Sequence, residues 1–220
     1  MSSEVDPRLA SALAAQLRMW RASLAGGAQR VGWKLGIGDR ERIGAGPVIG
    51  HLTTATLLPA GATFRAAGIP ALHADAEVAL ELARDVEPDA GRDAARAAIG
   101  GYGAALELVD LGPVAGGPEG IVATNVFHRA VAFAPVTVAQ MPTQVSGQLI
   151  VGGTVRDSAP ATADYGELVR SVAVLLDGAG ERLRAGDLLI TGSVVQVPVA
   201  AGDEVVADLG PLGAVGLSLT

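Results

Sequence analysis

The acidic residues of one predicted strand could hold a divalent cation. Residues 73–82 read HADAEVALEL, and a strand sends alternate side chains to opposite faces. Asp75 and Glu77 therefore share a face, roughly 6–7 Å apart along the strand, while the other face is apolar. A third carboxylate, Glu107, stands in the otherwise apolar stretch AALELV at residues 104–109. Oxygen ligands of this kind suit Mg²⁺, Mn²⁺ or Ca²⁺ better than zinc.

A second interpretation of the same acids requires no ligand. Asp75, Glu77 and Glu81 could form the solvated face of an amphipathic strand. Glu107 weighs against this interpretation, because its flanking residues are apolar and an unpaired buried carboxylate is costly.

Lys34 is the only lysine of the chain and stands in VGWKLGIG, residues 31–38. Near a cleft it could bind a carboxylate or stabilise an enolate. The alternative is a lysine at a strand end whose ammonium reaches water. The segment is not a dinucleotide-binding fingerprint, because Glu41 stands where the third glycine is required.

A third candidate segment is RAGDLLITGS at residues 184–193. A Gly-Asp turn leads into a short apolar strand that ends in Thr191, Gly192 and Ser193. Small residues at this end would let backbone N–H groups and the two hydroxyls approach an anionic ligand, although the pattern also fits an ordinary turn. Nucleophilic catalysis is disfavoured, because the chain has no cysteine and no Gly-x-Ser-x-Gly motif. Of its histidines, His73 is the best catalytic candidate because it borders the acidic pair.

These residues must be positioned by a mainly β framework. The first helix should begin at Pro7, capped by Asp6, and end at Gly26. Two further helices are predicted around residues 89–98 and 164–176. The predicted strands are residues 73–82, 103–109, 130–134, 145–151, 188–191, 204–209 and 214–219. Gly152-Gly153 signals a hairpin. Because helices and strands do not alternate regularly, we expect an α+β fold rather than a doubly wound parallel sheet.

Composition narrows the class of protein. A chain of 220 residues with 50% hydrophobic and 18% charged residues predicts one folded domain: a helical segment at 1–30 and a β-rich catalytic part at 31–220. A formal charge of −7 argues against a nucleic-acid partner. No apolar run reaches the ~18 residues of a membrane span, and residues 1–7 do not read as a secretory signal. We therefore expect a cytoplasmic protein.

Taken in order, several phrases resemble the fumarylacetoacetate hydrolase superfamily, and within it the 2-keto-4-pentenoate hydratase and 4-oxalocrotonate decarboxylase branch. The matching phrases are VGWKLGIG at 31–38, GHL at 50–52, HADAEVALEL at 73–82, AALELVD at 104–110, VATN at 122–125, RAGDLLITG at 184–192 and the closing hairpin GPLGAVGLSL at 210–219.

The resemblance implies a mixed, rolled β-sheet with peripheral helices, assembled as a homo-oligomer. It implies Mg²⁺ or Mn²⁺ held by Asp75, Glu77 and Glu107. Catalytic roles would fall to Lys34 and His73, and substrate binding to Asn125, Thr191 and Ser193. The implied activity is a lyase reaction on a small 2-hydroxy-dienoate or 2-oxo-enoate acid, as in the hydratases. Decarboxylation of a 4-oxalocrotonate-type acid, C–C bond hydrolysis, and a non-catalytic binding module are the alternatives.

The sequence departs from that branch at several positions. Asp75 stands where the branch usually has Glu, which shortens the first acidic side chain by one methylene. Val48 stands where hydratases tend to carry Asp, which removes a proton shuttle and favours decarboxylation over hydration. Ala163-Asp164-Tyr165 replaces a frequent Gly-His-Pro. The chain is also shorter than typical members, so the pocket walls should differ.

Overall fold

Two mixed β-sheets form the framework of the molecule. The computed structural model describes residues 7–36 and 47–220, and everything below concerns these residues. The first sheet has the strand order β2-β1-β9-β4-β5-β6 and the second the order β3-β11-β10-β7-β8. The pairs β1–β9 and β3–β11 are parallel and the other pairs are antiparallel. This confirms the predicted α+β, mainly β class with a mixed, curled sheet.

The first sheet consists of β1 (Arg30–Gly36), β2 (Val48–Thr53), β4 (Leu72–Leu82), β5 (Ile99–Asp110), β6 (His128–Phe133) and β9 (Leu188–Pro198). The second consists of β3 (Thr63–Phe64), β7 (Ser146–Val151), β8 (Thr154–Pro160), β10 (Glu204–Asp208) and β11 (Ala214–Leu219). The helices are α1 (Pro7–Ala25), α3 (Arg92–Ala97), α4 (Gly117–Ala123), α5 (Tyr165–Asp177) and the 3₁₀ turn η1 (Gly210–Leu212).

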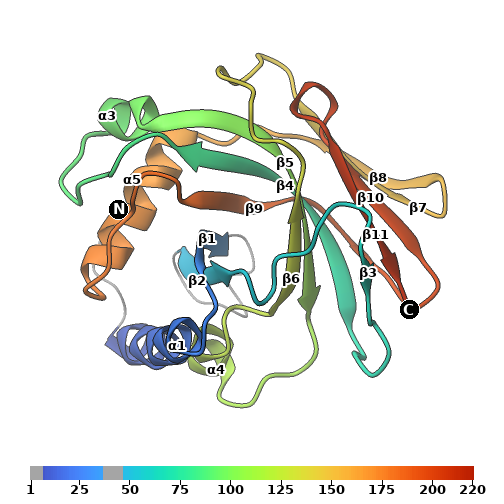
Figure 1. Cartoon of the computed structure of the whole chain (residues 1–220), viewed down its shortest axis with the longest axis horizontal. Coiled ribbons are helices and arrows are strands. Elements are labelled where there is room, and N and C mark those ends of the chain that lie inside the picture. The colour runs from blue at the N-terminus through green and yellow to red at the C-terminus, as the bar shows by residue number, and fades with distance from the viewer. Residues whose placement is uncertain (1–6, 37–46) are drawn as a thin grey trace.

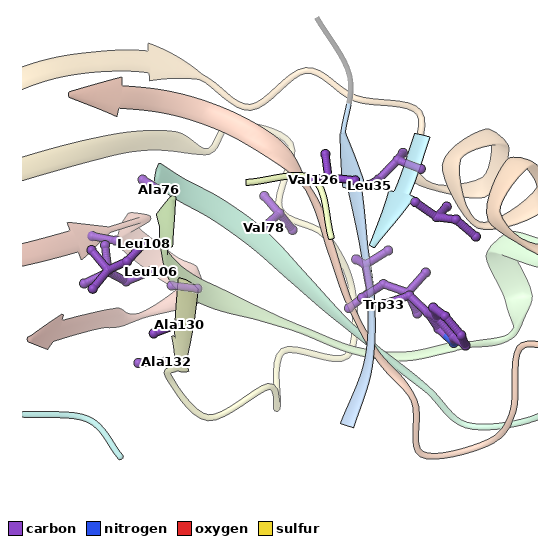
Figure 2. Close-up of a cluster of buried hydrophobic side chains, with 14 of the residues drawn as sticks. Trp33, Leu35, Ala76, Val78, Leu106, Leu108, Val126, Ala130 and Ala132 are labelled. Atoms are coloured by element: carbon purple, nitrogen blue, oxygen red, sulfur yellow. The ribbon is translucent and has the colours of Figure 1, made fainter. Parts of the chain in front are cut away.

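The apolar face of β4 and β5 lies in the main core. Ala76, Leu106 and Leu108 are fully buried and share one cluster with Leu149 of β7 and Val205 of β10. Figure 2 shows the first three gathered with Ala130 and Ala132 of β6, while Trp33, Leu35 and Val126 lie on the other side of the strands. Small side chains on this face let the two sheets approach closely, as expected of a chain with 3% aromatic residues.

The opposite face of β4 is also covered, because the first sheet curls over it. Leu52, Ala79, Ala105, Val131 and Ile190 form a second, smaller buried cluster drawn from β2, β4, β5, β6 and β9. Figure 1 shows β1 and β2 lying inside the curl, below β4, β5 and β9. The acidic face of β4 is therefore an interior surface.

The helices flank the curled sheet in two pairs. Helix α1 packs against α4 and β2, and α3 packs against α5; Figure 1 shows the two pairs at the lower and left margins. Asp164 caps α5 by accepting a hydrogen bond from the backbone N–H of Glu167 at 3.2 Å. No helix of the described chain is long and apolar enough to cross a membrane.

Most of the predicted elements are present, with shifted ends. The first helix ends at Ala25 and the third covers Tyr165–Asp177, as predicted, whereas the second is restricted to Arg92–Ala97. The expected hairpin joins β7 to β8 at Gly152 and Gly153, whose φ values of 58° and 77° suit a tight hairpin turn. Strand β9 runs to Pro198 instead of ending at Thr191, because irregular pairing with β4 carries it past the glycine. The prediction missed β1, β2, β3 and α4, and the expected cap Asp6 lies outside the described residues.

Candidate metal centre

Asp75, Glu77 and Glu107 meet inside the curled sheet. Asp75 lies directly opposite Glu107 in the antiparallel β4–β5 ladder, and Glu77 follows two residues along β4 on the same face. One carboxylate oxygen of each lies within 4.8 Å of the others. The strand alternation seen in the sequence thus delivers two acids, and the β4–β5 register delivers the third.

The acids are interior groups, which overturns the solvated-strand interpretation for Asp75 and Glu77. Their exposed fractions are 5% for Asp75, 2% for Glu77 and 1% for Glu107. Glu81, four residues after Glu77, is exposed, so the solvated interpretation holds only at the end of the strand. The physical reason is the curl of the sheet, which brings β1 and β2 over this face.

Lys34 is likewise buried, so it does not reach water at a strand end. Its exposed fraction is 4%, and Nζ donates to Glu107 Oε1 at 2.5 Å and to the carbonyl of Val126 at 3.0 Å. Its position follows from β1, which pairs with β9 on one side and β2 on the other. Lys34 supplies the positive charge that Glu107 needs in the interior.

His128 is the second partner of Glu107 and was not among the predicted site residues. Its Nδ1 lies 2.6 Å from Glu107 Oε1, and its Nε2 lies 2.9 Å from the Thr56 hydroxyl. Because an ionised carboxylate only accepts, Nδ1–H donates to Glu107 and Nε2 accepts from Thr56. Burial lowers the pKa of His128, although Glu107 opposes that shift. A neutral imidazole and Lys34 therefore share one oxygen of Glu107.

The surroundings favour ionisation of one of the three acids and disfavour ionisation of the other two. Burial alone would raise the pKa of Glu107, but Lys34 and His128 outweigh it, so this pKa is lowered. Burial and the charge of Glu107 raise the pKa of Asp75 to about 7 and that of Glu77 well above its usual value. Without a further cation, Glu77 favours the protonated form near neutral pH, whereas Asp75 is divided between its protonated and ionised forms there.

A bulge in β9 points a backbone N–H at Glu77. Thr191 and Gly192 together oppose the single residue Val78 of β4. The Gly192 N–H donates to Glu77 Oε2 at 2.7 Å, and the Thr191 hydroxyl donates to the Val78 carbonyl at 3.1 Å. Gly192 has a φ of 95°, which glycine tolerates best. The sequence predicts that this segment approaches an anionic ligand; in the structure its Gly192 N–H contacts the side chain of Glu77, and the ligand contact stays a prediction.

A cavity of about 110 Å³ opens beside the acids. Leu35, Val109, Leu111, Val126 and Phe127 supply apolar lining, and Ser193 and Gln196 supply neutral polar groups next to Lys34 and the acids. This volume is small compared with the ~300–1,000 Å³ of pockets for drug-sized ligands. The described lining suits a short ligand with an anionic head and an apolar remainder.

Three predicted site residues lie outside this lining. His73 is partly buried and its Nδ1 lies 3.0 Å from the carbonyl of Ala71. The Thr191 hydroxyl is used within the sheet, and the Asn125 side chain contacts the backbone of His51. Lys34, Asp75, Glu77, Glu107 and Ser193 are the predicted residues that the fold does bring to the cavity. The catalytic and substrate-binding roles themselves stay predictions.

Sequence reasoning also missed Gln196, which lines the cavity and lies opposite Asp75 in the β4–β9 ladder. It follows the predicted end of β9, so nothing local signalled it. His128 could have been found from antiparallel pairing of β5 with β6, since that pairing places it beside Val109.

The residues present fit a divalent cation. The hydrogen bonds described above hold Glu107 Oε1 and Glu77 Oε2 in place. They thereby also set the direction of the second oxygen of each carboxylate. Asp75 Oδ1 is buried and has no hydrogen-bond partner in the described part of the chain. A buried, unpartnered carboxylate oxygen beside two other acids is the environment that a metal ion would complete.

Comparison with known proteins places the chain in a family. The profile of the fumarylacetoacetate (FAA) hydrolase C-terminal family matches residues 37–218. The chain therefore belongs to the fumarylacetoacetate hydrolase family. The sequence matches no curated protein at a significant level.

Solved structures show the same fold at low identity. The 4-oxalocrotonate decarboxylase from Pseudomonas putida G7, complexed with magnesium and adipate, is 22% identical with a TM-score of 0.86, covering 96% of this chain and 86% of its own. Fumarylpyruvate hydrolase from Pseudomonas aeruginosa, in complex with Mn²⁺ and pyruvate, is 17% identical with a TM-score of 0.65, covering 87% of this chain and 90% of its own. A probable 2-hydroxyhepta-2,4-diene-1,7-dioate isomerase from Mycobacterium abscessus is 18% identical with a TM-score of 0.67, covering 97% and 89%.

Proposed function

We propose that the protein is a divalent-metal-dependent lyase acting on small 2-hydroxy-dienoate or 2-oxo-enoate acids, with Mg²⁺ or Mn²⁺ as its metal. The observation that carries this proposal is the group of three buried acids with ligand oxygens within 4.8 Å of one another, next to the buried Lys34. Once ionised, the three acids would carry more negative charge than Lys34 can balance, and a divalent cation would neutralise the excess. The solved relatives complexed with magnesium and with Mn²⁺ support the choice of metal.

The chain's own residues then account for binding and charge stabilisation. Asp75, Glu77 and Glu107 would hold the cation, which supplies Lewis-acid polarisation of a chelating carboxylate and 2-oxo group. Lys34 places a second positive charge where the substrate's enolate oxygen would develop negative charge. The apolar wall of the cavity keeps water from the carbon chain of the ligand, which strengthens both electrostatic effects.

Two lyase reactions share the same dienolate. In hydration, water adds across the alkene of a 2-oxo-3-enoate; in decarboxylation, CO₂ leaves and its electron pair remains in the dienolate. The overall resemblance favours the hydratase-like reaction. Position 48 favours decarboxylation: Val48 is buried and apolar, it pairs with Gly36 of the cavity wall, and it offers no acid to activate water. A departing carboxylate placed against such a wall is also poorly solvated, which promotes its loss as CO₂.

Metal binding is the first test. Metal-stripped protein is titrated with Mg²⁺ and Mn²⁺ by calorimetry, with and without oxalate as a mimic of the chelating 2-oxo acid head. We expect oxalate to tighten metal binding, and Glu107→Gln to weaken it by about 100-fold or more. Glu81→Gln is the matched control: it is the same change at an exposed position of the neighbouring strand β4 and should leave the affinity unchanged. Absence of metal binding in well-folded wild-type protein would sink the proposal.

Product analysis separates the reactions. Incubation of ¹³C-labelled 2-hydroxypentadienoate and of 4-oxalocrotonate with the metal-loaded protein, followed by NMR, distinguishes a hydrated product from released CO₂. Cleavage of a carbon–carbon bond with water uptake would identify a hydrolase on the same scaffold. Metal and oxalate binding without turnover of any such acid would instead support a binding module.

A further inference from the structure

A strained turn forms one wall of the cavity. Asn125, Val126 and Phe127 have φ values of 66°, 52° and 64°. These are the only non-glycine residues with positive φ in the described chain. Contact between Cβ and the carbonyl oxygen disfavours this left-handed conformation, most of all for a β-branched residue such as Val126. Such a turn persists only where surrounding contacts impose it, and such turns gather at functional sites.

Backbone hydrogen bonds tie the turn to Ile121 and Asp110, and the side chain of Asn125 adds two contacts to another strand. Its Oδ1 accepts a hydrogen bond from the backbone N–H of His51 at 2.7 Å, and its Nδ2 donates to the His51 carbonyl at 3.0 Å. Both bonds go to the main chain of β2, so the amide ties the turn to a rigid strand. We refer to this pair of hydrogen bonds as the Asn125 clamp.

Gly50 makes room for the clamp and for Lys34 at the same point. A Cβ built on Gly50 would lie 2.6 Å from Lys34 Cγ and 2.8 Å from Asn125 Oδ1, both closer than such contacts allow. Gly50 is the register partner of Lys34 in the β1–β2 ladder and precedes His51. The clamp and the lysine side chain therefore pack against the same glycine.

The turn presents the Val126 carbonyl to Lys34. Lys34 Nζ donates to this oxygen at 3.0 Å and to Glu107 Oε1 at 2.5 Å. An ammonium group has three N–H donors in a fixed tetrahedral arrangement. Two fixed acceptors determine the direction of the third N–H, on a side chain that lines the cavity.

We propose that Asn125 is a positioning residue: through the clamp it maintains the left-handed turn at 125–127, whose Val126 carbonyl orients the Lys34 ammonium. This role differs from the direct substrate contact expected for Asn125. That this orientation of the Lys34 ammonium serves catalysis rests on the proposed function. The contacts that lead from His51 to Lys34 do not depend on it.

The test uses the fact that Lys34 is the only lysine of the chain. Protein grown with ¹³C,¹⁵N-lysine gives a single set of side-chain NMR signals, recorded in metal-free protein. In the wild type we expect non-equivalent Hε protons, slow solvent exchange of the ammonium protons and a nuclear Overhauser contact between Lys34 Hε and Val126. Absence of that contact in folded wild-type protein would overturn the proposal without any variant.

Asn125→Gly removes the clamp while relieving the backbone strain, since glycine adopts positive φ freely. We expect the Hε protons to become equivalent and ammonium exchange to accelerate by about 10-fold or more, as lost charge-assisted hydrogen bonding predicts. Asn125→Asp keeps an acceptor for the His51 N–H but loses the donor, so an intermediate change is expected, and it serves if the glycine variant does not fold.

His51→Gln is the matched control, because both clamp bonds go to the backbone of His51. It should leave the Lys34 signals unchanged. Wild-type Lys34 signals in folded Asn125→Gly, or equal disturbance in His51→Gln, would refute the clamp. Since these readouts need neither metal nor substrate, failure of oxalate-assisted metal binding would reject the proposed function and leave this test intact.

Discussion

The surroundings of Asp75 indicate that the acidic site lowers the stability of the metal-free protein. Its Oδ1 is buried without a partner in the described structure, and it faces Glu107 across the ladder. Like charges directly opposite each other destabilise a sheet. A cation that binds all three acids would reverse the sign of these interactions, so residues chosen for binding should weaken the metal-free protein.

Asp75→Asn should therefore stabilise the metal-free protein while weakening metal binding. The neutral amide keeps the size of the side chain but removes a charge from a crowded acidic cluster. We expect the free energy of unfolding at pH 8 without metal to rise by about 0.5–2 kcal/mol, as measured by urea denaturation. Calorimetry should show a loss of Mg²⁺ affinity. A variant that is less stable and binds metal as well as the wild type would contradict this assignment.

The environment of His51 should make the stability of the folded protein depend on pH. Burial is the main cause that lowers the pKa of His51 from 6.5 to about 4, and its buried Nδ1 has no hydrogen-bond partner among the described residues. The unfolded chain therefore binds a proton before the folded chain does. The stability contribution of this group is complete above pH 6.5 and is lost as the pH falls toward 4.

His51→Gln should remove this loss of stability at low pH. Between pH 7 and 4.5 we expect the wild type to lose on the order of 1–2 kcal/mol more unfolding free energy than the variant. Urea denaturation of both proteins across this range measures the difference, in which the shared contributions of other groups cancel. Parallel profiles would show that His51 is not neutral and buried in the folded protein.

Among the elements, β9 carries the feature on which the site most depends. Its bulge opposite Val78 rotates the Gly192 N–H toward Glu77, which a regular ladder would have directed at a backbone carbonyl. The turn before the same strand contains Gly186, whose φ of 83° is also left-handed and whose missing Cβ would meet nothing within 4 Å. The two glycines thus share a left-handed conformation, but of the two only Gly192 contacts an acid of the site and lines the cavity.

Gly192→Ala and Gly186→Ala form a matched pair. Both should lower the free energy of unfolding by about 1–2 kcal/mol, the cost of left-handed backbone at a residue with a Cβ. Gly192→Ala alone should weaken Mg²⁺ binding, because the shifted backbone no longer holds Glu77. Denaturation and calorimetry on both variants test this, and equal loss of metal affinity would show that the bulge has no special role.

At the scale of the whole molecule, Arg30 joins α1 to the sheet and to the turn before β9. Its Nε and Nη2 donate to the two carboxylate oxygens of Asp187 at 2.6 and 2.5 Å. Its guanidinium carbon lies 5.8 Å from the ring centre of Trp20 in α1 and 5.1 Å from that of Trp33 in β1. Asp187 is buried, so this is an interior ion pair, and it lies just before the segment that carries Thr191 and Gly192.

Arg30→Ala should destabilise the protein by about 3–5 kcal/mol, because it leaves the carboxylate of Asp187 buried without its partner. Arg182→Ala is the control: the Arg182 side chain pairs with Glu87, but the two side chains are 65% and 61% exposed. That change should cost less than about 1 kcal/mol. Thermal or urea unfolding distinguishes them, and similar losses would contradict the burial argument. The homo-oligomeric state stays a prediction that sedimentation can test.

Features with a local physical cause could be predicted from the sequence alone. The two-residue period of a strand placed Asp75 and Glu77 on one face. Pro7 and Gly26 marked the ends of α1, and Gly152-Gly153 marked the β7–β8 hairpin. The acidic residue types themselves indicated a hard divalent cation. These conclusions depend on neighbours within a few positions, where backbone geometry leaves few choices.

Only the tertiary structure decided whether those acids face water or the interior. Burial of this face depends on the curl of the first sheet and on pairing between β1 and β9, which are far apart in the chain. The same holds for the register that sets Asp75 opposite Glu107, for His128 and Gln196, and for the left-handed turn at Asn125. Each is maintained by contacts over long sequence separations, which can override local preference and leave no local pattern.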